Sequence, residues 1–388
     1  MRFLIPVSSI VVLGALAGCG GGWRPDVQES PLVRKDATLA VALDDDANEI
    51  ILELPPVDLP AGRADAGADH SGHGGDAAEG EKAAGGDAAG GDGHAAHGGQ
   101  ETEAYIGRMP VGGWLRGYRV ELIDAHDRPV PSELLHHMNL ISPDRRELFS
   151  PIMQRIAAAG QETAPVRLPR IFGYPFEVNE RVLLKAMLHN PTPTAYDGVR
   201  VRVHLRYTPA STLFAPWHVF PFYLDVMPPA GSHAFDLPPG RSEQSWEGRP
   251  VVAGRIAALG GHLHRYAEVL RLEDVTAGKV LWESEPMLDE VGNVSGMPQD
   301  FVIRRLGIAI DPAHTYRLTA VYDNPTGTTI VDGGMGALGG VLIVDRNAQW
   351  PAVDPADPEY VRDVEFTVHS RDPDVMVQQQ GTTPAHSH

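Results

Sequence analysis

Cysteine is almost absent from this chain, which has 388 residues and a single cysteine, Cys19. One cysteine excludes an intramolecular disulfide and every zinc or iron–sulfur site built from several cysteines. Basic residues are also few, with 32 Lys and Arg against 51 Asp and Glu and a formal net charge of −19. A protein that binds nucleic acid needs a basic face to replace phosphate counterions, so we expect no nucleic-acid partner.

Long hydrophobic runs are scarce as well. The apolar run 3–16 follows a basic start and is too short to span a bilayer comfortably, but it has the length of a signal-peptide core. It ends in Leu16-Ala17-Gly18-Cys19, and small residues before a cysteine resemble a bacterial lipobox. We therefore expect a lipoprotein signal peptide over residues 1–18, a lipidated Cys19 and a polar tether over 19–35. The alternative is an ordinary signal peptide with an incidental cysteine.

A lipidated Cys19 would place the chain outside the cytoplasm, anchored to a membrane of the bacterial envelope. Several acyl chains on one cysteine anchor a protein firmly, whereas a single acyl chain binds only marginally. Gly20, rather than an acidic residue, follows the cysteine. By resemblance to enterobacterial sorting, this favours the outer membrane if the source is Gram-negative.

Glycine and proline, in contrast, are abundant at 42 and 33 residues, which disfavours long helices and suits short strands joined by turns. Residues 199–207 alternate apolar and basic side chains with the period of two that is typical of a strand. Further strand-like runs lie at 115–123, 181–188 and 317–322, and a second set of runs extends from Trp217 to Val344. The spacing predicts an all-β fold with two antiparallel β-sandwiches in tandem.

The same runs give the expected domain boundaries. Residues 36–60 supply the leading strands of the N-terminal sandwich, which continues over 104–209. Residues 210–345 form the C-terminal sandwich. Residues 346–388 are a tail rich in Pro and Asp, with one candidate strand at 364–368.

Residues 61–103 interrupt this pattern. Of the 40 residues from Ala61 to Gln100, 25 are Gly or Ala, and none is a larger hydrophobic residue. Such a stretch buries too little apolar surface to offset its ordering entropy, so we predict a disordered insert. The insert carries four histidines among acidic residues: His70, His73, His94 and His97. They could capture metal loosely, or the insert could serve only as a solubilising segment.

Two histidine motifs lie within the expected strands. His262 and His264 are spaced i and i+2, which on a strand places both imidazoles on one face, as chelation requires. His136 and His137 are adjacent, and in a regular strand they would point to opposite faces. They could reach one ion only at a strand end or at a β-bulge.

The order of the motifs along the chain strengthens the case for metal. His136-His137-Met138 is followed by Met187-Leu188-His189, then by His262-Leu263-His264 and then by Gly334-Met335-Gly336. This order resembles the type II copper monooxygenases, the family of peptidylglycine α-hydroxylating monooxygenase and dopamine β-monooxygenase. The resemblance covers roughly residues 104–345 and includes Met109-Pro110-Val111, which matches a related segment before the His-His strand of the family.

The resemblance implies two coppers per chain in jelly-roll-like sandwiches that face each other across a water-filled cleft. One copper would be bound by His136, His137 and His189, and the other by His262, His264 and Met335. In the family the first copper relays an electron from ascorbate or another one-electron donor, and the second binds O2 and attacks a C–H bond of a small molecule. Three imidazoles suit both copper oxidation states, whereas a thioether favours Cu(I). The second set is therefore expected to be catalytic.

Departures from the family limit what the resemblance implies. Gly260 stands where the peptidylglycine enzyme has an arginine that holds the substrate carboxylate, and Ala337 and Gly339 stand where the family has polar and aromatic anchors. The disulfides of the animal members are also missing. We therefore do not expect peptide amidation. Two interpretations stay open: a lipid-anchored copper monooxygenase that hydroxylates an unidentified small molecule, and a non-catalytic extracytoplasmic copper-binding or copper-delivery protein.

The remaining polar side chains near these motifs receive structural interpretations. Four histidines match no ligand position of the family and are expected to be structural or exposed: His204, His218, His233 and His314. Arg265 and Tyr266 directly follow the second motif and could contact a substrate, although a structural role is at least as well supported.

Overall fold

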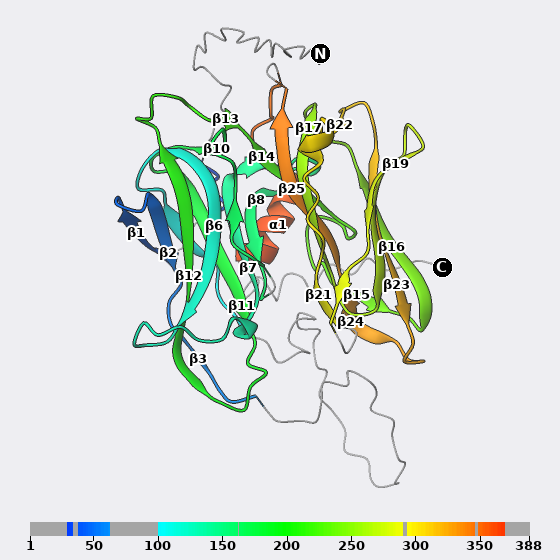
Figure 1. Ribbon diagram of the computed structural model, residues 1–388, viewed down its shortest axis with the longest axis horizontal. Coiled ribbons are helices and arrows are strands. Elements are labelled where there is room, and N and C mark those ends of the chain that lie inside the picture. Colours follow the sequence, from blue (N-terminus) through cyan, green and yellow to red (C-terminus); the bar gives the residue numbers. More distant parts are fainter. Residues whose placement is uncertain are drawn as a thin grey trace, which may run out of the picture.

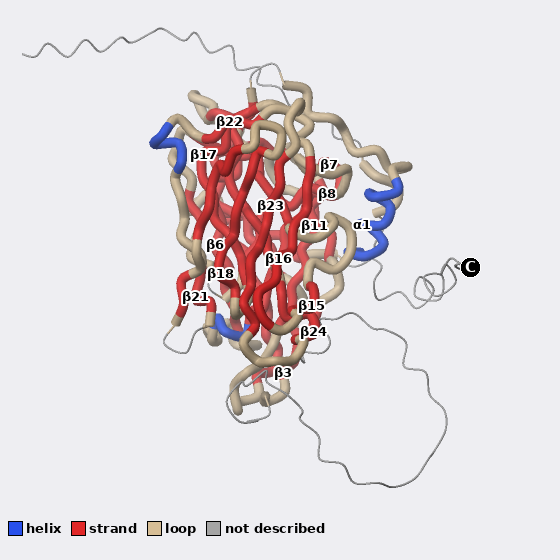
Figure 2. The backbone as a smooth tube through the Cα atoms, turned by 90° about the vertical axis from the view of Figure 1, so that its right-hand side faces the viewer, coloured by secondary structure: helices blue, strands red, loops and turns tan. Residues whose placement is uncertain are grey.

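The structure is a computed structural model that describes residues 29–33, 38–62, 100–161, 163–289, 293–345 and 348–368. Cys19 and the four histidines of the insert lie outside these ranges, as do the signal peptide and most of the tether. Strands dominate the described ranges, and the expected all-β class is confirmed (Figure 1). The strands run lengthwise through the molecule in antiparallel sheets that stack face to face (Figure 2).

The first sheet forms one outer face of the molecule. Its strand order is β1 (Ala40–Asp44), β2 (Glu49–Glu53), β12 (Tyr196–Pro209), β6 (Gly113–Ile123), β10 (Phe172–Phe176) and β13 (Trp217–His218), with β3 (Val57–Leu59) paired to β12 and β9 (Val166–Arg167) paired to β6. Strands β1, β2 and β3 lie within residues 36–60, where the sequence predicted leading strands. The second set of strands was expected to begin at Trp217, and this was wrong: β13 pairs in parallel with β10, so the second set begins after it.

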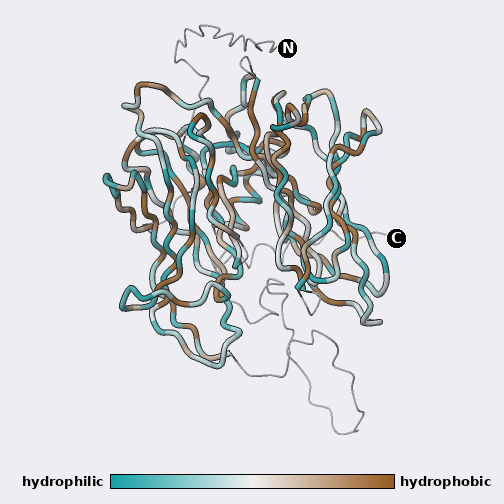
Figure 3. Tube along the Cα trace, viewed as in Figure 1, coloured by the Kyte–Doolittle hydropathy of each residue, from teal (hydrophilic) through white to brown (hydrophobic). Residues whose placement is uncertain are grey.

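The alternation seen in the sequence of β12 explains why this sheet forms. Val201 and Val203 are buried, whereas Arg200 and Arg202 lie on the opposite face. Arg202 lies directly across from Glu53 of β2, and its Nε donates to Glu53 Oε2 at 2.7 Å. An opposite-charge pair at a directly facing position stabilises the register of two strands. Figure 3 shows the alternation of hydrophilic and hydrophobic residues along the strands.

The second sheet packs against the first and carries the first histidine motif. It contains β4 (Gln100–Glu101), β5 (Tyr105–Arg108), β11 (Arg181–Leu188), β7 (Leu135–Arg146) and β8 (Met153–Ala159), and the 3-10 turn η2 (Ser132–Leu134) precedes β7. All eight residues of β11 are buried, because the first sheet covers one face of this sheet and the helix α1 (Pro358–Val368) lies against the other.

The remaining strands belong to the second half of the chain. One sheet has the order β14 (Phe220–Asp225), β25 (Gly336–Val344), β17 (Gly254–Leu263) and β22 (Ile308–Ile310), with the 3-10 turn η3 (Val302–Arg305) beside it. The facing sheet has the order β16 (Gly240–Gly248), β23 (Tyr316–Asn324), β18 (Ala267–Asp274) and β19 (Lys279–Ser284). Two short pairs complete the set: β15 (Phe235–Leu237) with β24 (Ile330–Gly334), and β20 (Met287–Leu288) with β21 (Val294–Gly296).

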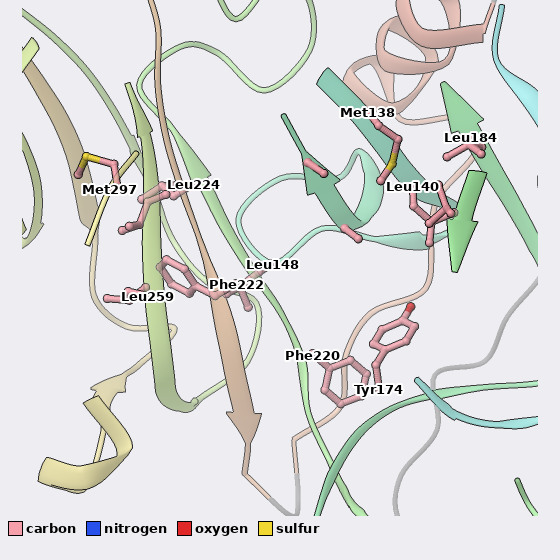
Figure 4. Packing of buried hydrophobic residues seen from close by; sticks show 14 of the residues in the cluster. Met138, Leu140, Leu148, Tyr174, Leu184, Phe220, Phe222, Leu224, Leu259 and Met297 are labelled. Atoms are coloured by element: carbon pink, nitrogen blue, oxygen red, sulfur yellow. The ribbon is translucent and has the colours of Figure 1, made fainter. Parts of the chain in front are cut away.

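One continuous hydrophobic cluster runs through both halves of the chain. Tyr174 of β10 lies edge to face with Phe220 of β14, with ring centroids 6.0 Å apart (Figure 4). Trp350 packs on Phe220 at 5.2 Å, and its Nε1 donates to the carbonyl of Arg146 at 2.9 Å. The end of β7 and the start of β14 are therefore held together.

The segment 364–368, a candidate strand from its sequence, is instead part of the α-helix α1 (Pro358–Val368). Asp357 caps this helix, because its Oδ1 accepts the N–H of Glu359 at 2.8 Å, and proline occupies the first helical position. The buried residues Tyr360, Val364 and Val368 repeat with helical spacing and lie against β7, β8 and β11. Within the described ranges, no helix is long and apolar enough to cross a membrane.

Candidate metal centres

The adjacent histidines lie at a β-bulge. In the ladder between β11 and β7, Met187 faces His137 and the next residue, Leu188, faces Leu135, so His136 is an extra residue with no partner across the ladder. A bulge places two residues of one strand opposite one of the next and redirects their side chains. The condition that the sequence set for two neighbouring histidines to reach one ion is therefore met.

The two imidazoles converge. The Nδ1 atoms of His136 and His137 lie 2.9 Å apart, and the ring centroids are 5.1 Å apart with the planes at 75°. With nitrogen–metal distances of about 2.1 Å, as in zinc sites, two nitrogens on one ion lie about 3 Å apart at a right angle. The pair thus fits the separation that one metal ion requires.

His189 is brought to the same end of the sheet by its backbone. It follows the last residue of β11, and its N–H donates to the carbonyl of Leu134 at 2.9 Å, next to the bulge. The three imidazoles do not form a complete metal site in this structure. The described residues contain no group of three or more His, Cys, Asp or Glu side chains placed to hold a metal ion. The first centre is a converged pair with a third histidine beside it.

The second histidine pair lies at the end of β17. Gly261 and Leu263 point into the core, since Leu263 is buried and a Cβ on Gly261 would lie 2.6 Å from Leu270. Alternation along the strand therefore turns His262 and His264 to the opposite face, away from the core. Their ring centroids are 5.2 Å apart with the planes at 84°. The i, i+2 spacing has the effect that the sequence predicted.

Met335 lies beside His264. The ladder between β17 and β25 ends where Leu263 faces Gly336, and His264 and Met335 are the next residues of the two segments. The backbones of His264 and Met335 therefore lie close together where the ladder ends.

Tyr322 of β23 joins these two segments, and sequence reasoning missed this role. Its hydroxyl accepts the N–H of His264 at 3.0 Å and the N–H of Met335 at 3.1 Å, and it donates to the carbonyl of Met335. The side chain is fully buried, and burial raises its pKa to about 12. Only its place at the end of the strand-like run 317–322 was visible in the sequence.

The surface beside the second pair is bare. Gly260 faces Gly339 in the ladder, two rows from His262 and Ala337. A Cβ on Gly260 would approach only Gln299 Cγ at 3.8 Å, and one on Gly339 only the carbonyl of Gly260 at 3.8 Å. The positions that depart from the family therefore form an open strip of backbone next to the imidazoles.

The bulge lies at the opposite end of β7 from the contact that Trp350 makes with Arg146. Trp350 binds the last residue of β7, and the bulge lies at the first residues of that strand. In the other half of the chain, Asp225 at the end of β14 faces Ala337, which in turn faces His262. The sheets that carry the two centres lie next to each other in the middle of the molecule (Figure 1). Each centre thus lies at the end of an interior strand, the first at the start of β7 and the second at the end of β17.

The histidines assigned no metal role have other neighbours. His204 is buried between Glu49 at 3.1 Å and Glu121 at 3.0 Å, and His314 Nδ1 lies 2.7 Å from Asp274. His233 Nδ1 lies 3.1 Å from Asp225. The ring of His218 lies 6.3 Å from that of Trp114.

Arg265 and Tyr266, which follow the second pair, contact each other. The guanidinium of Arg265 lies 4.9 Å from the centroid of the Tyr266 ring. Tyr266 has a φ of +70°, at the turn that leads from β17 into β18. This geometry is that of a turn and does not reveal a contact to substrate.

No protein-family model matches the chain, and no curated protein matches it.

Proposed function

We propose that the chain is a copper monooxygenase of the type II class that hydroxylates a C–H bond of a small molecule with O2. The observation that supports this most is the pair of unlike ligand sets. One is an imidazole pair at a bulge with a third histidine beside it, and the other is an imidazole pair whose His264 backbone is joined to that of Met335 by the Tyr322 hydroxyl. A protein that only stores copper does not need two chemically different sites.

In this proposal the ligands follow the resemblance. His136, His137 and His189 would hold one copper, and His262, His264 and Met335 the other. Bound there, copper would supply one-electron transfer and the activation of O2. One oxygen atom enters the C–H bond and the other leaves as water, which consumes two protons and two electrons from ascorbate or another one-electron donor.

The residues of the chain have separate tasks. Three imidazoles tolerate both oxidation states, whereas the soft thioether of Met335 favours the reduced ion. Tyr322 fixes the backbones of His264 and Met335, so the position of the thioether relative to the imidazoles is set by a buried hydroxyl. The bare strip of Gly260 and Gly339 offers a substrate no charged group, which argues against a carboxylate-bearing peptide.

The finer architecture and the location belong to the same proposal. We infer two jelly-roll-like sandwiches in tandem, over 36–209 apart from the insert and over 210–345, that face each other across a cleft. We infer lipidation of Cys19 and an anchored position outside the cytoplasm. Support comes from the pairing of two sheets in each half of the chain and from the lipobox-like sequence.

A non-catalytic role in copper binding or delivery is the second candidate. The glycine and alanine positions beside the second pair favour it, because no polar or aromatic side chain is held there to orient a substrate. In that case the two pairs would exchange copper without turnover.

Oxygen consumption separates the two candidates. The purified chain is loaded with copper, and ascorbate-dependent O2 uptake is followed with a panel of small aliphatic and aromatic compounds. The monooxygenase proposal predicts uptake that a substrate stimulates and that His262→Ala/His264→Ala abolishes, while His314→Ala, a histidine outside both centres, keeps it. Two bound coppers without stimulated uptake by any compound would favour the binding protein.

A further inference from the structure

Large apolar side chains are exposed together at one end of the molecule. Leu213 and Phe214 in the loop between β12 and β13 are 88% and 82% exposed, and Leu306 after η3 is 79% exposed. We call this surface the apolar end, and it consists of Ile171, Val178, Leu213, Phe214, Trp217, Ile303 and Leu306. Single exposed apolar residues are common on soluble proteins, but a group at one end marks an interaction surface.

The strand registers show that the two halves of the chain contribute to the same end. Trp217 comes three residues before Phe220, which faces Leu342 of β25, and Leu342 faces Ile256 of β17. At that point the guanidinium of Arg255 donates to the carbonyl of Leu306 at 2.9 Å. The loop before β14 and the turn after η3 therefore lie at the same ends of paired strands, in agreement with Figure 1, where β13 and β22 are both at the top.

The other members join through the first sheet. The N–H of Trp217 donates to the carbonyl of Ile171 at 2.6 Å, and the N–H of Ala210 donates to that of Gly112 at 3.1 Å. A Cβ on Gly112 would in turn lie 3.3 Å from the backbone N of Val178. These contacts bring the turn after β10 and the loop after β12 to the same edge.

Arginines accompany the apolar side chains in a chain that is otherwise strongly acidic. Arg116, Arg167, Arg170 and Arg206 lie on and between β6, β9, β10 and β12. Burial, followed by the charges of Arg170 and Arg206, lowers the pKa of Arg116, so both of these guanidiniums lie near that of Arg116. Among the described residues, no carboxylate forms an ion pair with any of the four.

We propose that the apolar end lies on a lipid bilayer with anionic headgroups. Leu, Ile, Phe and Trp side chains at an interface enter the boundary between headgroups and acyl chains, while arginines bind lipid phosphates. The proposal rests on the envelope location inferred above and is independent of copper. A protein surface would be an alternative occupant, but the group of arginines without acidic partners favours phosphate.

The first residues that the structure describes support this orientation. The carbonyl of Ser30 accepts Arg181 Nη2 at 3.0 Å, and Glu29 pairs with Arg108 at 2.7 Å, both at the turn that carries Val178. Glu29 is ten residues from Cys19, a length of chain that reaches at most about 35 Å. A lipid on Cys19 would thus hold this end of the molecule close to the bilayer.

The orientation also places the metal centres. His262 is six residues along β17 from Ile256, or about 20 Å at the rise of a strand. The ligand pairs would therefore point away from the membrane, toward water-soluble reductant and substrate.

Hydrogen exchange of the full chain tests the proposal. Exchange is measured with and without vesicles of equal parts phosphatidylcholine and phosphatidylglycerol, and with vesicles of phosphatidylcholine alone. We expect amides of 210–217 and 303–307 to exchange about tenfold more slowly on the anionic vesicles. Leu213→Ser/Phe214→Ser should remove this protection in both segments, whereas Met287→Ser/Leu288→Ser, a matched exposed apolar pair on β20, should keep it.

Each other outcome contradicts the proposal. Equal exchange with and without anionic vesicles would show that the end does not touch lipid, even if mass spectrometry finds a lipid on Cys19. Protection that appears without vesicles and grows with protein concentration would assign the surface to a second copy of the chain. Equal protection on both vesicle types would show that the arginines do not bind anionic headgroups. None of these outcomes depends on the metal centres.

Discussion

Tyr322 is a single buried side chain that connects the two strands of the second centre. Its hydroxyl accepts two backbone N–H groups from segments more than seventy residues apart. Nothing in a sequence reveals such a contact, because the partners are backbone groups whose meeting depends on the complete sheet register. The face of His262 and His264, in contrast, follows from the period of a strand and was predictable.

Replacing this hydroxyl gives the first prediction. Tyr322→Phe leaves the N–H groups of His264 and Met335 without an acceptor, so we expect the free energy of unfolding to fall by about 1–3 kcal/mol. Loss of this support should also weaken Cu(I) binding at the second centre by about 10–100-fold. Urea unfolding and competition with a Cu(I) chelator measure the two effects.

The matched control is Tyr316→Phe, which removes another buried hydroxyl that accepts a single backbone N–H, that of Asp311 at 2.9 Å. It should lower stability and leave Cu(I) affinity unchanged. Equal Cu(I) affinities for the two variants would mean that Tyr322 has no part in the metal centre.

Glu147 is a buried carboxyl group whose raised pKa makes the stability of the fold depend on pH. Its carboxylate is buried and accepts the N–H groups of Arg155 at 2.7 Å and Leu148 at 2.9 Å. Burial raises its pKa from 4.5 to about 7, more than these hydrogen bonds lower it. Between these two pH values the folded chain keeps a proton that the unfolded chain has lost.

The sign of the pH dependence follows. The protonated Glu147 carboxyl contributes fully to the free energy of unfolding below about pH 4.5. This contribution is lost as the pH rises to about 7, and the loss amounts to up to about 3 kcal/mol. Glu147→Gln cannot release a proton, so its unfolding free energy should change less between pH 5 and 7 than that of the wild type, as measured by urea titration. The exposed control Glu133→Gln should retain the wild-type slope; an unchanged slope in Glu147→Gln would rule out the raised pKa.

At the scale of elements, the bulge in β7 and the helix α1 show what sequence patterns leave open. From the sequence, we expected that His136 and His137 could reach one ion only at a bulge or a strand end. An extra residue in one strand can be recognised only when the partner strand is known. The segment 364–368 is rich in apolar residues and short enough to be compatible with either period. The segment is helical because Asp357 caps the helix and because its apolar residues are buried at helical spacing.

A prediction concerns the attachment of α1. Asp363 is fully buried and accepts Arg155 at 2.5 and 2.8 Å and the N–H of Met153 at 3.0 Å. Asp363→Asn leaves Arg155 as a buried charge without its partner, so we expect a loss of about 3–5 kcal/mol in unfolding free energy. Asp357→Ala removes only the helix cap and should cost about 1 kcal/mol. Thermal unfolding ranks the two; equal losses would mean that the ion pair does not hold the helix.

At the scale of the whole molecule, the insert begins and ends close to the first centre. The N–H of Gly62 donates to the carbonyl of Thr192 at 2.7 Å, and Gln100 faces Leu188 in the ladder between β4 and β11. Both ends are therefore held within a few residues of His189. The change in composition marked the insert in the sequence, but its point of attachment required the strand pairing.

This geometry predicts that the insert is dispensable for folding. Replacing 63–99 by a short Gly-Ser linker should leave the thermal unfolding midpoint within a few degrees of the wild type, because the two ends already lie close together. Circular dichroism monitors the change. A collapse of stability would show that the segment is part of the folded core.

The copper content of the chain shows whether both histidine pairs bind metal. It is measured in a full chain whose insert histidines, His70, His73, His94 and His97, are replaced by alanine, after removal of loosely bound metal. We expect two coppers per parent chain, one copper in the His136→Ala/His137→Ala variant and one copper in the His262→Ala/His264→Ala variant. Fewer than two coppers in the parent chain, or an unchanged content in either double variant, would contradict the assignment of two copper sites.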